Sequence, residues 1–251
     1  DARPFALWRY PDRLADALAD LLAAAPPFDQ AAVTMTGELA DCFATRREGV
    51  EAILAAVFQA LARRPAYLYQ TDGQLLPIDD PRRDVSRIAA SNWHALAAYA
   101  CRWTDGLPSL LIDVGSTTVD LIPIDEGRVV ARGASDVERL IYGELVYTGV
   151  ERSPVCAVAA ALPYRGNDVP VAQEFFATTV DAYLILGALG EDPRSCETAD
   201  GRPRTIDAAR RRLGRVICTE LAAAEARCIA EAVVDAQVQL VVKAWQNAVA
   251  V

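Results

Sequence analysis

The chain has 251 residues, of which 53% are hydrophobic and 7% aromatic, and its formal net charge is −9. This apolar content excludes an intrinsically disordered chain, and the negative charge argues against a nucleic-acid-binding surface. The charge does not exclude phosphate ligands, because backbone N–H groups bind them without net positive charge.

Six cysteines and a single histidine, His94, are spread along the chain. No two cysteines have the C-x-x-C spacing, so a zinc site is not expected. Scattered cysteines in apolar surroundings are typical of reduced thiols, and we expect a cytoplasmic protein. We expect neither a signal peptide nor a membrane span, because no apolar run reaches membrane length.

The first hundred residues alternate between helical and strand-like patterns. Apolar residues recur at helical spacing in three segments, and two short apolar runs resemble buried strands. A stretch rich in Pro, Gly and Asp separates the second of these strands from the third helix. The patterns predict helices at 12–25, 47–64 and 91–103, strands at 31–35 and 66–70, and a loop at 71–84.

The pattern then changes to short strands. SLLID, VDLIPI and RVVAR are joined by the turns GSTT and DEG, which predicts a β-meander within 109–132. The alternation of helices and strands in the first half indicates an α/β architecture. After Asp136 the sequence predicts a mostly helical remainder, with helices at 136–146, 153–161, 173–189 and 205–234.

The stretch SLLIDVGSTTVDLIPI at 109–124 is the first candidate site. Its turn has no bulky side chain, so backbone N–H groups can approach a phosphate closely, and an Mg²⁺ ion could lie between that phosphate and the preceding acid. An ordinary hairpin with a polar turn fits equally well, but an acid that ends an apolar strand favours the site. The residues concerned are Asp113, Gly115, Ser116, Thr117, Thr118 and Asp120.

A second small-residue turn follows a short strand in VTMTGELADC at 33–42, where Thr36 and Gly37 precede Glu38. The alternative is a helix N-terminus, with Thr36 as the N-cap and the acids favoured by the helix dipole. The presence of two such turns in one chain weakens that alternative.

Two further stretches carry polar residues between helical patterns. In ELVYTGVERSPV, at 144–155, Arg152 beside a glycine turn could give a second grip on a diphosphate, although a solvated arginine is the simpler interpretation. In the stretch 164–183, Thr178 and Asp181 could face a cleft or water. The candidate substrate-binding residues are Asn92, Trp93, Glu144, Tyr147 and Arg165.

The combination of MTGELADCF, SNW, DVGSTTVDLIPI, ELVYTGVERSPV and EFFATTVDAY resembles the hydantoinase A/oxoprolinase-related proteins of the tetrahydromethanopterin-linked C1 transfer pathway. The resemblance runs from about Trp8 to about Leu240. It implies an actin-like two-domain α/β fold, as in the acetate and sugar kinase/Hsp70/actin superfamily, with ribonuclease H-like halves and a central cleft. Residues 1–104, completed by 235–251, would form the first half, and 105–234 the second.

The resemblance also implies a reaction, in which the phenol oxygen of a tyramine or tyrosine unit displaces diphosphate from a furanylmethyl carbon. The product would belong to methanofuran or methylofuran, which are C1 carriers, and no ATP would be needed. Glu38 is the first candidate base and Asp120 the second, while Asp113 would hold Mg²⁺. We expect Glu38 and Asp113 to face each other across one cleft. The diphosphate would be bound by Thr36, Gly37, Gly115, Ser116, Thr117, Thr118 and Arg152.

Two family segments lack a counterpart in this sequence. The opening DARPFALWRY is similar to the end of a first meander, without the loop D-I-G-G-A-N, and QLVVKAWQNAVAV passes from a strand-like to a helix-like run without a late glycine-rich segment. We expect both segments to lie outside this sequence; the alternative is that the protein lacks them, which would leave the site incomplete. A small-molecule kinase or ATPase and a non-catalytic binding protein remain alternatives. The expected partners are small molecules, with a homo-oligomer left open, and neither nucleic acid nor a membrane.

Overall fold

The computed structural model describes residues 2–62 and 64–249. The chain divides into two compact units. Unit 1 combines the residues up to Ser109 with Pro123–Arg139, and unit 2 combines Leu110–Ile122 with the residues from Leu140 onward. The sequence instead suggested one half at 1–104 with 235–251 and another at 105–234, so Pro123–Arg139 and the end of the chain are grouped differently.

Unit 1 contains a three-stranded sheet, in which β1 (Ala31–Val33) runs parallel to β2 (Ala66–Tyr69) and β2 runs antiparallel to β3 (Leu75–Pro77). Both predicted strands are confirmed. The strand β3 lies inside the segment that was expected to be a loop. It forms because the tight turn between Gln70 and Gln74 reverses the chain and pairs Leu76 with Leu68.

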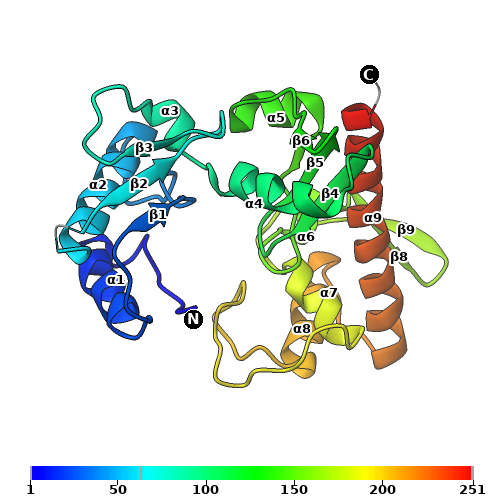
Figure 1. Ribbon diagram of the computed structural model, residues 1–251. Helices are drawn as coiled ribbons and strands as arrows, with labels where there is room; N and C mark the ends of the chain where they lie inside the picture. The colour runs from blue at the N-terminus through cyan, green and yellow to red at the C-terminus, as the bar shows by residue number, and fades with distance from the viewer. Residues whose placement is uncertain (1, 63, 250–251) are drawn as a thin grey trace. The chain divides into compact units, whose positions relative to one another are not determined.

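The helices of unit 1 lie at the three segments where the sequence predicts helix, except for one short helix at 85–88 that was not predicted. They are η1 (Pro11–Arg13), α1 (Leu14–Ala23), α2 (Arg46–Ala60), α3 (Val85–Ile88), α4 (Asn92–Ala100) and η2 (Cys101–Trp103). Thr45 caps α2 by accepting a hydrogen bond from the Glu48 amide. The apolar faces of α1 and α2 pack together beside the sheet (Figure 1). The core residues from α2 are Val50, Ile53, Leu54 and Val57.

The predicted meander is present as β4 (Ser109–Val114), β5 (Val119–Asp125) and β6 (Arg128–Val129). The division between the units falls within β5. In unit 1 the end of β5 pairs with β6, and in unit 2 its beginning pairs with β7 (Leu145–Val146). The strand β7 follows directly on α5 (Asp136–Tyr142), so the helix predicted at 136–146 ends earlier than expected.

The rest of unit 2 is less helical than the sequence suggests. A hairpin of β8 (Ala161–Tyr164) and β9 (Asn167–Pro170) lies between the helices predicted at 153–161 and 173–189, and both of these helices are shorter than expected. Its two turn residues, Arg165 and Gly166, both have positive φ angles, of 49° and 79°, as the tight turns of two-residue hairpins require. The helices that do form are α6 (Val155–Val158), α7 (Thr179–Ile185), α8 (Ile206–Val216) and α9 (Ala223–Val249).

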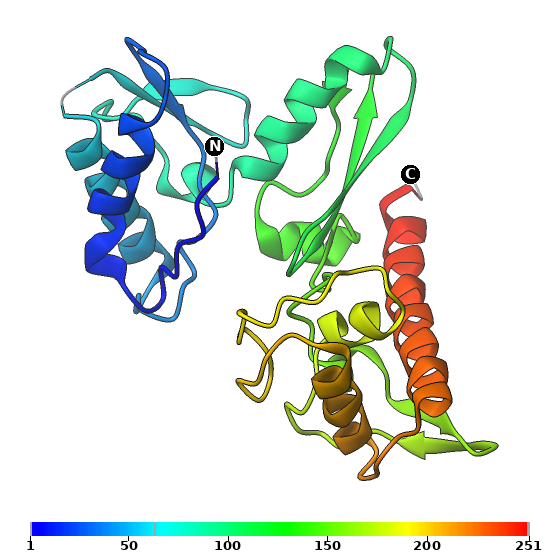
Figure 2. The same ribbon diagram turned by 90° about the horizontal axis from the view of Figure 1, so that it is seen from below.

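The core of unit 2 is built on α9, which has 27 residues. Ile229, Ala230 and Val233 on this helix are fully buried and pack with residues of α7, α8 and the hairpin. Figure 2 shows the hairpin at the N-terminal end of α9. Near the other end, a Cβ atom added to Gly143 would lie 2.4 Å from the carbonyl oxygen of Ala244. The helix therefore stays in unit 2 along its whole length, and the strand-like run that opens QLVVKAWQNAVAV is helical.

The described helices lack the combination of length and apolar character that crossing a membrane requires.

Candidate functional site

The turn at 115–118 is held by the loop that follows β7. Within the turn, the Gly115 amide donates to the Thr118 carbonyl oxygen at 2.8 Å. The Val150 amide donates to the Gly115 carbonyl at 3.0 Å, and the amides of Glu151 and Arg152 both donate to the Ser116 carbonyl at 3.0 Å. Two stretches that the sequence singled out separately are thus joined in unit 2.

This contact depends on Gly149. A Cβ atom at this position would lie 2.4 Å from the Thr117 nitrogen and 2.5 Å from the Ser116 carbonyl carbon. Real Cβ atoms do not approach a backbone so closely, and any side chain would push the turn away. The glycine is needed here for close approach of two backbone segments.

The hydrogen bonds determine which polar groups of the turn are left for a ligand. Its carbonyls at Gly115 and Ser116 are occupied by the loop amides, whereas the amides of Ser116 and Thr117 donate to no acceptor in the described part of the chain. The Ser116 and Thr117 hydroxyl oxygens lie 3.5 Å apart beside them. A turn that offers N–H and O–H donors while its carbonyls are engaged favours an anion over a cation.

Two acids flank this turn. Asp113 lies near the end of β4 and Asp120 near the start of β5, and both are half-buried. Among the described residues, no cluster of three or more His, Cys, Asp or Glu side chains could enclose a metal ion. A metal held here would therefore need ligands from a bound molecule or from water, as Mg²⁺ commonly has.

The other predicted residues of unit 2 lie in three different settings. Glu144 is fully buried, and its carbonyl oxygen accepts a hydrogen bond from the Leu121 amide at 2.9 Å. Tyr147 is 68% exposed, so it is available to a ligand or a partner. Arg165 lies in the turn of the β8–β9 hairpin, where its Nε donates to Glu225 at 2.9 Å. That ion pair gives Arg165 a structural partner.

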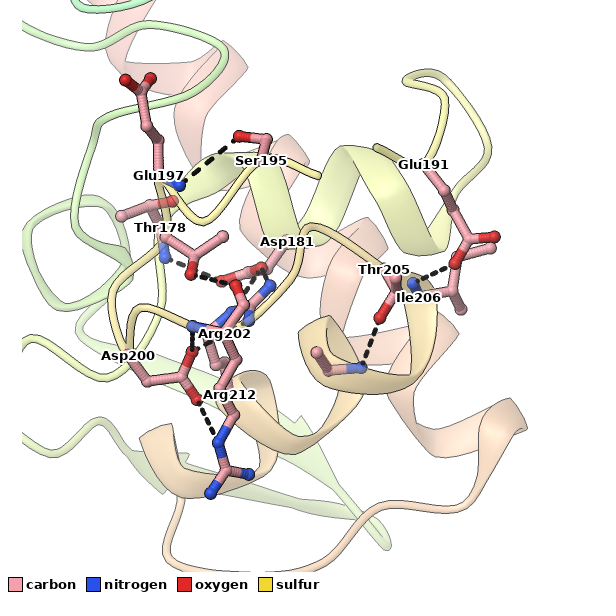
Figure 3. Close-up of polar contacts among 12 residues, drawn as sticks. Thr178, Asp181, Glu191, Ser195, Glu197, Asp200, Arg202, Thr205, Ile206 and Arg212 are labelled. Carbon is pink, nitrogen blue, oxygen red and sulfur yellow. Dashed lines mark hydrogen bonds and ion pairs between the residues drawn. The ribbon is translucent and has the colours of Figure 1, made fainter. Parts of the chain in front are cut away.

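Thr178 and Asp181 form the capping box of α7 instead of facing water. Asp181 is fully buried and accepts hydrogen bonds from Arg212 at 2.9 and 2.6 Å, and Arg212 also reaches Asp200 at 3.1 Å (Figure 3). Asp200 in turn binds Arg215. The expectation of a cleft-facing pair was wrong for Asp181, because a buried carboxylate needs a buried cation and α8 supplies one.

In unit 1 the turn at 36–38 is organised differently. Glu38 is only 2% exposed, and both of its carboxylate oxygens are engaged. Oε2 accepts from the Gly37 amide at 2.9 Å, and Oε1 accepts from the Arg46 guanidinium at 3.1 Å. Thr36 is exposed. This turn therefore carries its own anion, which already binds one of its amides.

Arg46 joins Glu38 to a second acid that the sequence did not indicate. Its Nη2 also lies 2.8 Å from Oδ2 of Asp136, at the start of α5. Burial raises the pKa of Asp136, with Arg46 acting against the rise and the neighbouring Glu38 adding to it. Ninety residues separate Arg46 from Asp136 in the sequence, and no local pattern predicts such a pair.

The predicted residues Asn92 and Trp93 begin α4 in unit 1. Trp93 is buried, and the Arg139 guanidinium carbon lies 3.9 Å from its ring centre, which is a cation–π contact. The neighbouring His94 is hydrogen-bonded through Nδ1 to the Tyr69 hydroxyl at 2.9 Å. Burial lowers the pKa of His94, so the neutral ring is favoured.

Comparisons with known proteins show the family of this chain. A family model described as hydantoinase/oxoprolinase matches residues 29–249. The (4-{4-[2-(gamma-L-glutamylamino)ethyl]phenoxymethyl}furan-2-yl)methanamine synthase of Methanocaldococcus jannaschii is 35% identical over 216 residues, which cover 86% of this chain and 64% of that protein. The synthase of the same name from Methanococcus vannielii is 37% identical over 112 residues, which cover 45% of this chain and 50% of that protein.

Proposed function

The chain belongs to the hydantoinase/oxoprolinase family, and from that membership we propose that it is a transferase of methanofuran or methylofuran biosynthesis. It joins a furanylmethyl diphosphate to the phenol oxygen of a tyramine or tyrosine unit. The C–O bond to the diphosphate breaks, a new bond forms between the furanylmethyl carbon and the phenol oxygen, and the phenolic proton passes to a carboxylate. The names of the two relatives describe a product with this aryl ether.

The observation that carries the proposal is the direction of the hydrogen bonds around the turn at 115–118. The Ser116 carbonyl is occupied by the amides of Glu151 and Arg152, so the turn presents donors to a ligand. Donors that are already in place stabilise the negative charge that develops on a departing diphosphate. The hydroxyls of Ser116, Thr117 and Thr118 and the exposed side chain of Arg152 would add to this binding.

Mg²⁺ is part of the proposal, with Asp113 as its protein ligand. A single carboxylate beside a phosphate-binding turn suits this ion, which usually takes one or two carboxylates together with phosphate oxygens and water. When bound, the ion would neutralise charge on the leaving diphosphate. Asp113→Asn should then remove the Mg²⁺ dependence of diphosphate binding without unfolding the protein. Calorimetry that finds the same affinity with and without Mg²⁺ in both forms would reject this role.

Glu38 and Asp120 remain the proposed candidates for the base. A phenol has a pKa near 10, so a carboxylate that accepts its proton as the new bond forms helps the reaction. Glu38→Gln should lower turnover far more than diphosphate affinity, because the amide keeps the shape and loses the base. The same comparison with Asp120→Asn assigns the role to one of the two.

The finer fold assignment also belongs to this proposal. The structure is mixed α/β, and we propose the actin-like two-domain arrangement with ribonuclease H-like halves. It is supported by family membership and by the division of the chain into two compact units. The six free cysteines suit the cytoplasmic location that we also propose.

The test uses the complete protein with a furanylmethyl diphosphate and either tyramine or tyrosine, in the presence of Mg²⁺ and the absence of nucleotide. We expect an aryl ether and free diphosphate in equal amounts. Product that forms only when ATP is added would instead support a small-molecule kinase or ATPase. Diphosphate binding without turnover of any furan substrate would support a non-catalytic binding protein.

A further inference from the structure

Gln237 lies on the buried face of α9, one helical turn after Val233, and is 4% exposed. Both ends of its side-chain amide are used. Nε2 donates to the Gly149 carbonyl oxygen at 2.7 Å and to Thr148 Oγ1 at 2.8 Å, while Oε1 accepts from the Tyr183 hydroxyl at 2.8 Å. The Gly149 contact fixes which way the amide points, because a carbonyl oxygen only accepts and must therefore face Nε2.

The loop is also held from α7 and from within. Thr179 Oγ1 donates to the same Gly149 carbonyl at 2.7 Å, and the Gly149 amide donates to Ser153 Oγ at 2.8 Å. All of these groups are neutral and, apart from the half-buried Tyr183, buried. The Gly149 carbonyl is therefore held by two side chains that lie far from it in the sequence, and its amide is held by Ser153, four residues further on.

The position of Gly149 determines that of the anion-binding turn. Its Cα atom packs directly against the peptide between Ser116 and Thr117, with no room for a side chain. The next residues, Val150 to Arg152, donate the amides that occupy the turn's carbonyls. Any shift of the Gly149 carbonyl would be passed on to both contacts, because packed backbone segments cannot deform independently.

We propose that Gln237 is a positioning residue for the turn at 115–118. Through the loop from Thr148 to Arg152, it keeps the turn's carbonyls engaged and its amides directed at the diphosphate. This inference rests on the proposed function for its ligand, but the mechanical link from α9 to the turn does not require any ligand.

Two substitutions separate shape from hydrogen bonding. Gln237→Met keeps the length of the side chain and removes both donors, so the Gly149 carbonyl loses one of its partners. Gln237→Glu places an oxygen where Nε2 donates, and this oxygen repels the Gly149 carbonyl. We expect inorganic diphosphate to bind about tenfold more weakly to the Met variant and more weakly still to the Glu variant. Tyr183→Phe should have a smaller effect of about two- to threefold.

The matched control is Ile229→Val, which removes a methyl group from the same buried face of α9, two turns before Gln237 and outside the loop network. Affinities are measured by calorimetry with Mg²⁺ and inorganic diphosphate, at a temperature where circular dichroism shows every variant to be folded. The control should bind diphosphate as the parent does. Equal affinity of the Gln237→Glu variant and the parent would overturn the proposal.

Hydrogen exchange provides a second measurement that needs no ligand. In Gln237→Met the amides of Val150, Glu151 and Arg152 should exchange faster than in the parent, and those in β8 should not change. If the loop amides are as protected as in the parent, the proposal is rejected. If the parent fails to bind diphosphate but the exchange changes as expected, the proposed function fails while Gln237 is still shown to set the turn.

Discussion

The two small-residue turns of this protein look equivalent in sequence, but their hydrogen bonding in the structure differs. In the turn at 36–38, the carboxylate of Glu38 accepts from the Gly37 amide and is paired with Arg46. In the turn at 115–118, the carbonyls accept from loop amides and no acidic side chain binds the amides of Ser116 and Thr117 in the described part of the chain. The first turn therefore has an internal anion, whereas the second leaves the amides of Ser116 and Thr117 without an acceptor among the described residues.

This difference shows that turns of similar residue types can leave different backbone groups available for a ligand. Both turns contain a glycine and a hydroxyl residue after a short strand, and both lie near acids. The deciding factor is which of the turn's own groups are already hydrogen-bonded, since an occupied amide cannot bind a ligand. In the first turn, the buried carboxylate of Glu38 already accepts from the Gly37 amide.

The largest effects are expected from substitution of the two glycines that pack against the turns. Gly149→Ala should weaken diphosphate binding at least about tenfold and lower the free energy of unfolding by about 1–3 kcal/mol, because its Cβ atom would overlap the Ser116–Thr117 peptide. Gly49→Ala makes a similar overlap, 2.1 Å from the Glu38 carbonyl oxygen. It should destabilise the protein without changing diphosphate affinity.

These two variants are compared by calorimetry and by urea denaturation. Equal losses of diphosphate affinity in Gly49→Ala and Gly149→Ala would remove the distinction between the turns.

Arg46→Met tests the internal anion of the first turn. It leaves the buried Glu38 and the half-buried Asp136 without their shared cation, so the free energy of unfolding should fall by about 2–4 kcal/mol. The control is Arg13→Met, which breaks an ion pair with Asp16 whose side chains are 72% and 67% exposed. It should change stability by less than about 1 kcal/mol. Urea denaturation of both variants measures the difference, and equal losses would contradict the assignment.

Removing hydroxyls compares the turns directly. Thr117→Ala should weaken diphosphate binding by about three- to tenfold, because a donor beside the two amides is lost. Thr36→Ala, at the exposed position of the first turn, should leave the affinity unchanged. Titrations with inorganic diphosphate decide the point. A larger loss in the Thr36 variant would indicate that the first turn is the binding site.

The smallest expected effect is a pH dependence of stability. It should arise from the charged surroundings of His94 in unit 1, because the network around Gly149 in unit 2 is neutral. His94 is the only histidine in the chain. It faces Tyr69, Asp72 and Arg139, and burial lowers its pKa below the ordinary value of 6.5. The folded state then binds the proton less readily than the unfolded state, so stability should rise as pH increases up to about 6.5 and then level off.

His94→Gln should flatten this rise in the urea midpoint between about pH 5.5 and pH 7. An unchanged slope in the variant would show that other groups cause the pH dependence.

Much of the fold could be predicted from the sequence where pattern and packing agree. The apolar spacing of α2 and the strand–turn–strand order of the meander both survive in the structure. The strand β3 was missed because its partner β2 supplies the pairing that a Pro- and Gly-rich segment does not indicate by itself. The run that opens QLVVKAWQNAVAV resembles a strand because β-branched residues lower helix propensity, but packing within unit 2 overrides that preference and the run is part of α9.

The candidate site could be predicted only where its signals are local in the sequence. Local signals located the turn at 115–118 and Arg152, since small residues and charges are visible in a short window. Arg46 and Asp136 were missed because their pairing spans 90 residues. Gln237 did carry a signal, as a polar residue in the buried row of Ile229 and Val233, four residues apart. A buried amide in such a row needs hydrogen-bond partners, and that requirement could have marked it.

The buried ion pair between Arg212 and Asp181 also has a consequence for cooperativity. The exposed loop between α7 and α8 is fastened to it through Asp200, so the loop cannot leave the surface without uncovering charges that water does not reach. Loop and helix should therefore open together in one sub-global event, which makes this loop resistant to proteases despite its length. Cleavage there would report the unfolding of unit 2, and Arg212→Met would convert that slow event into ordinary loop fraying.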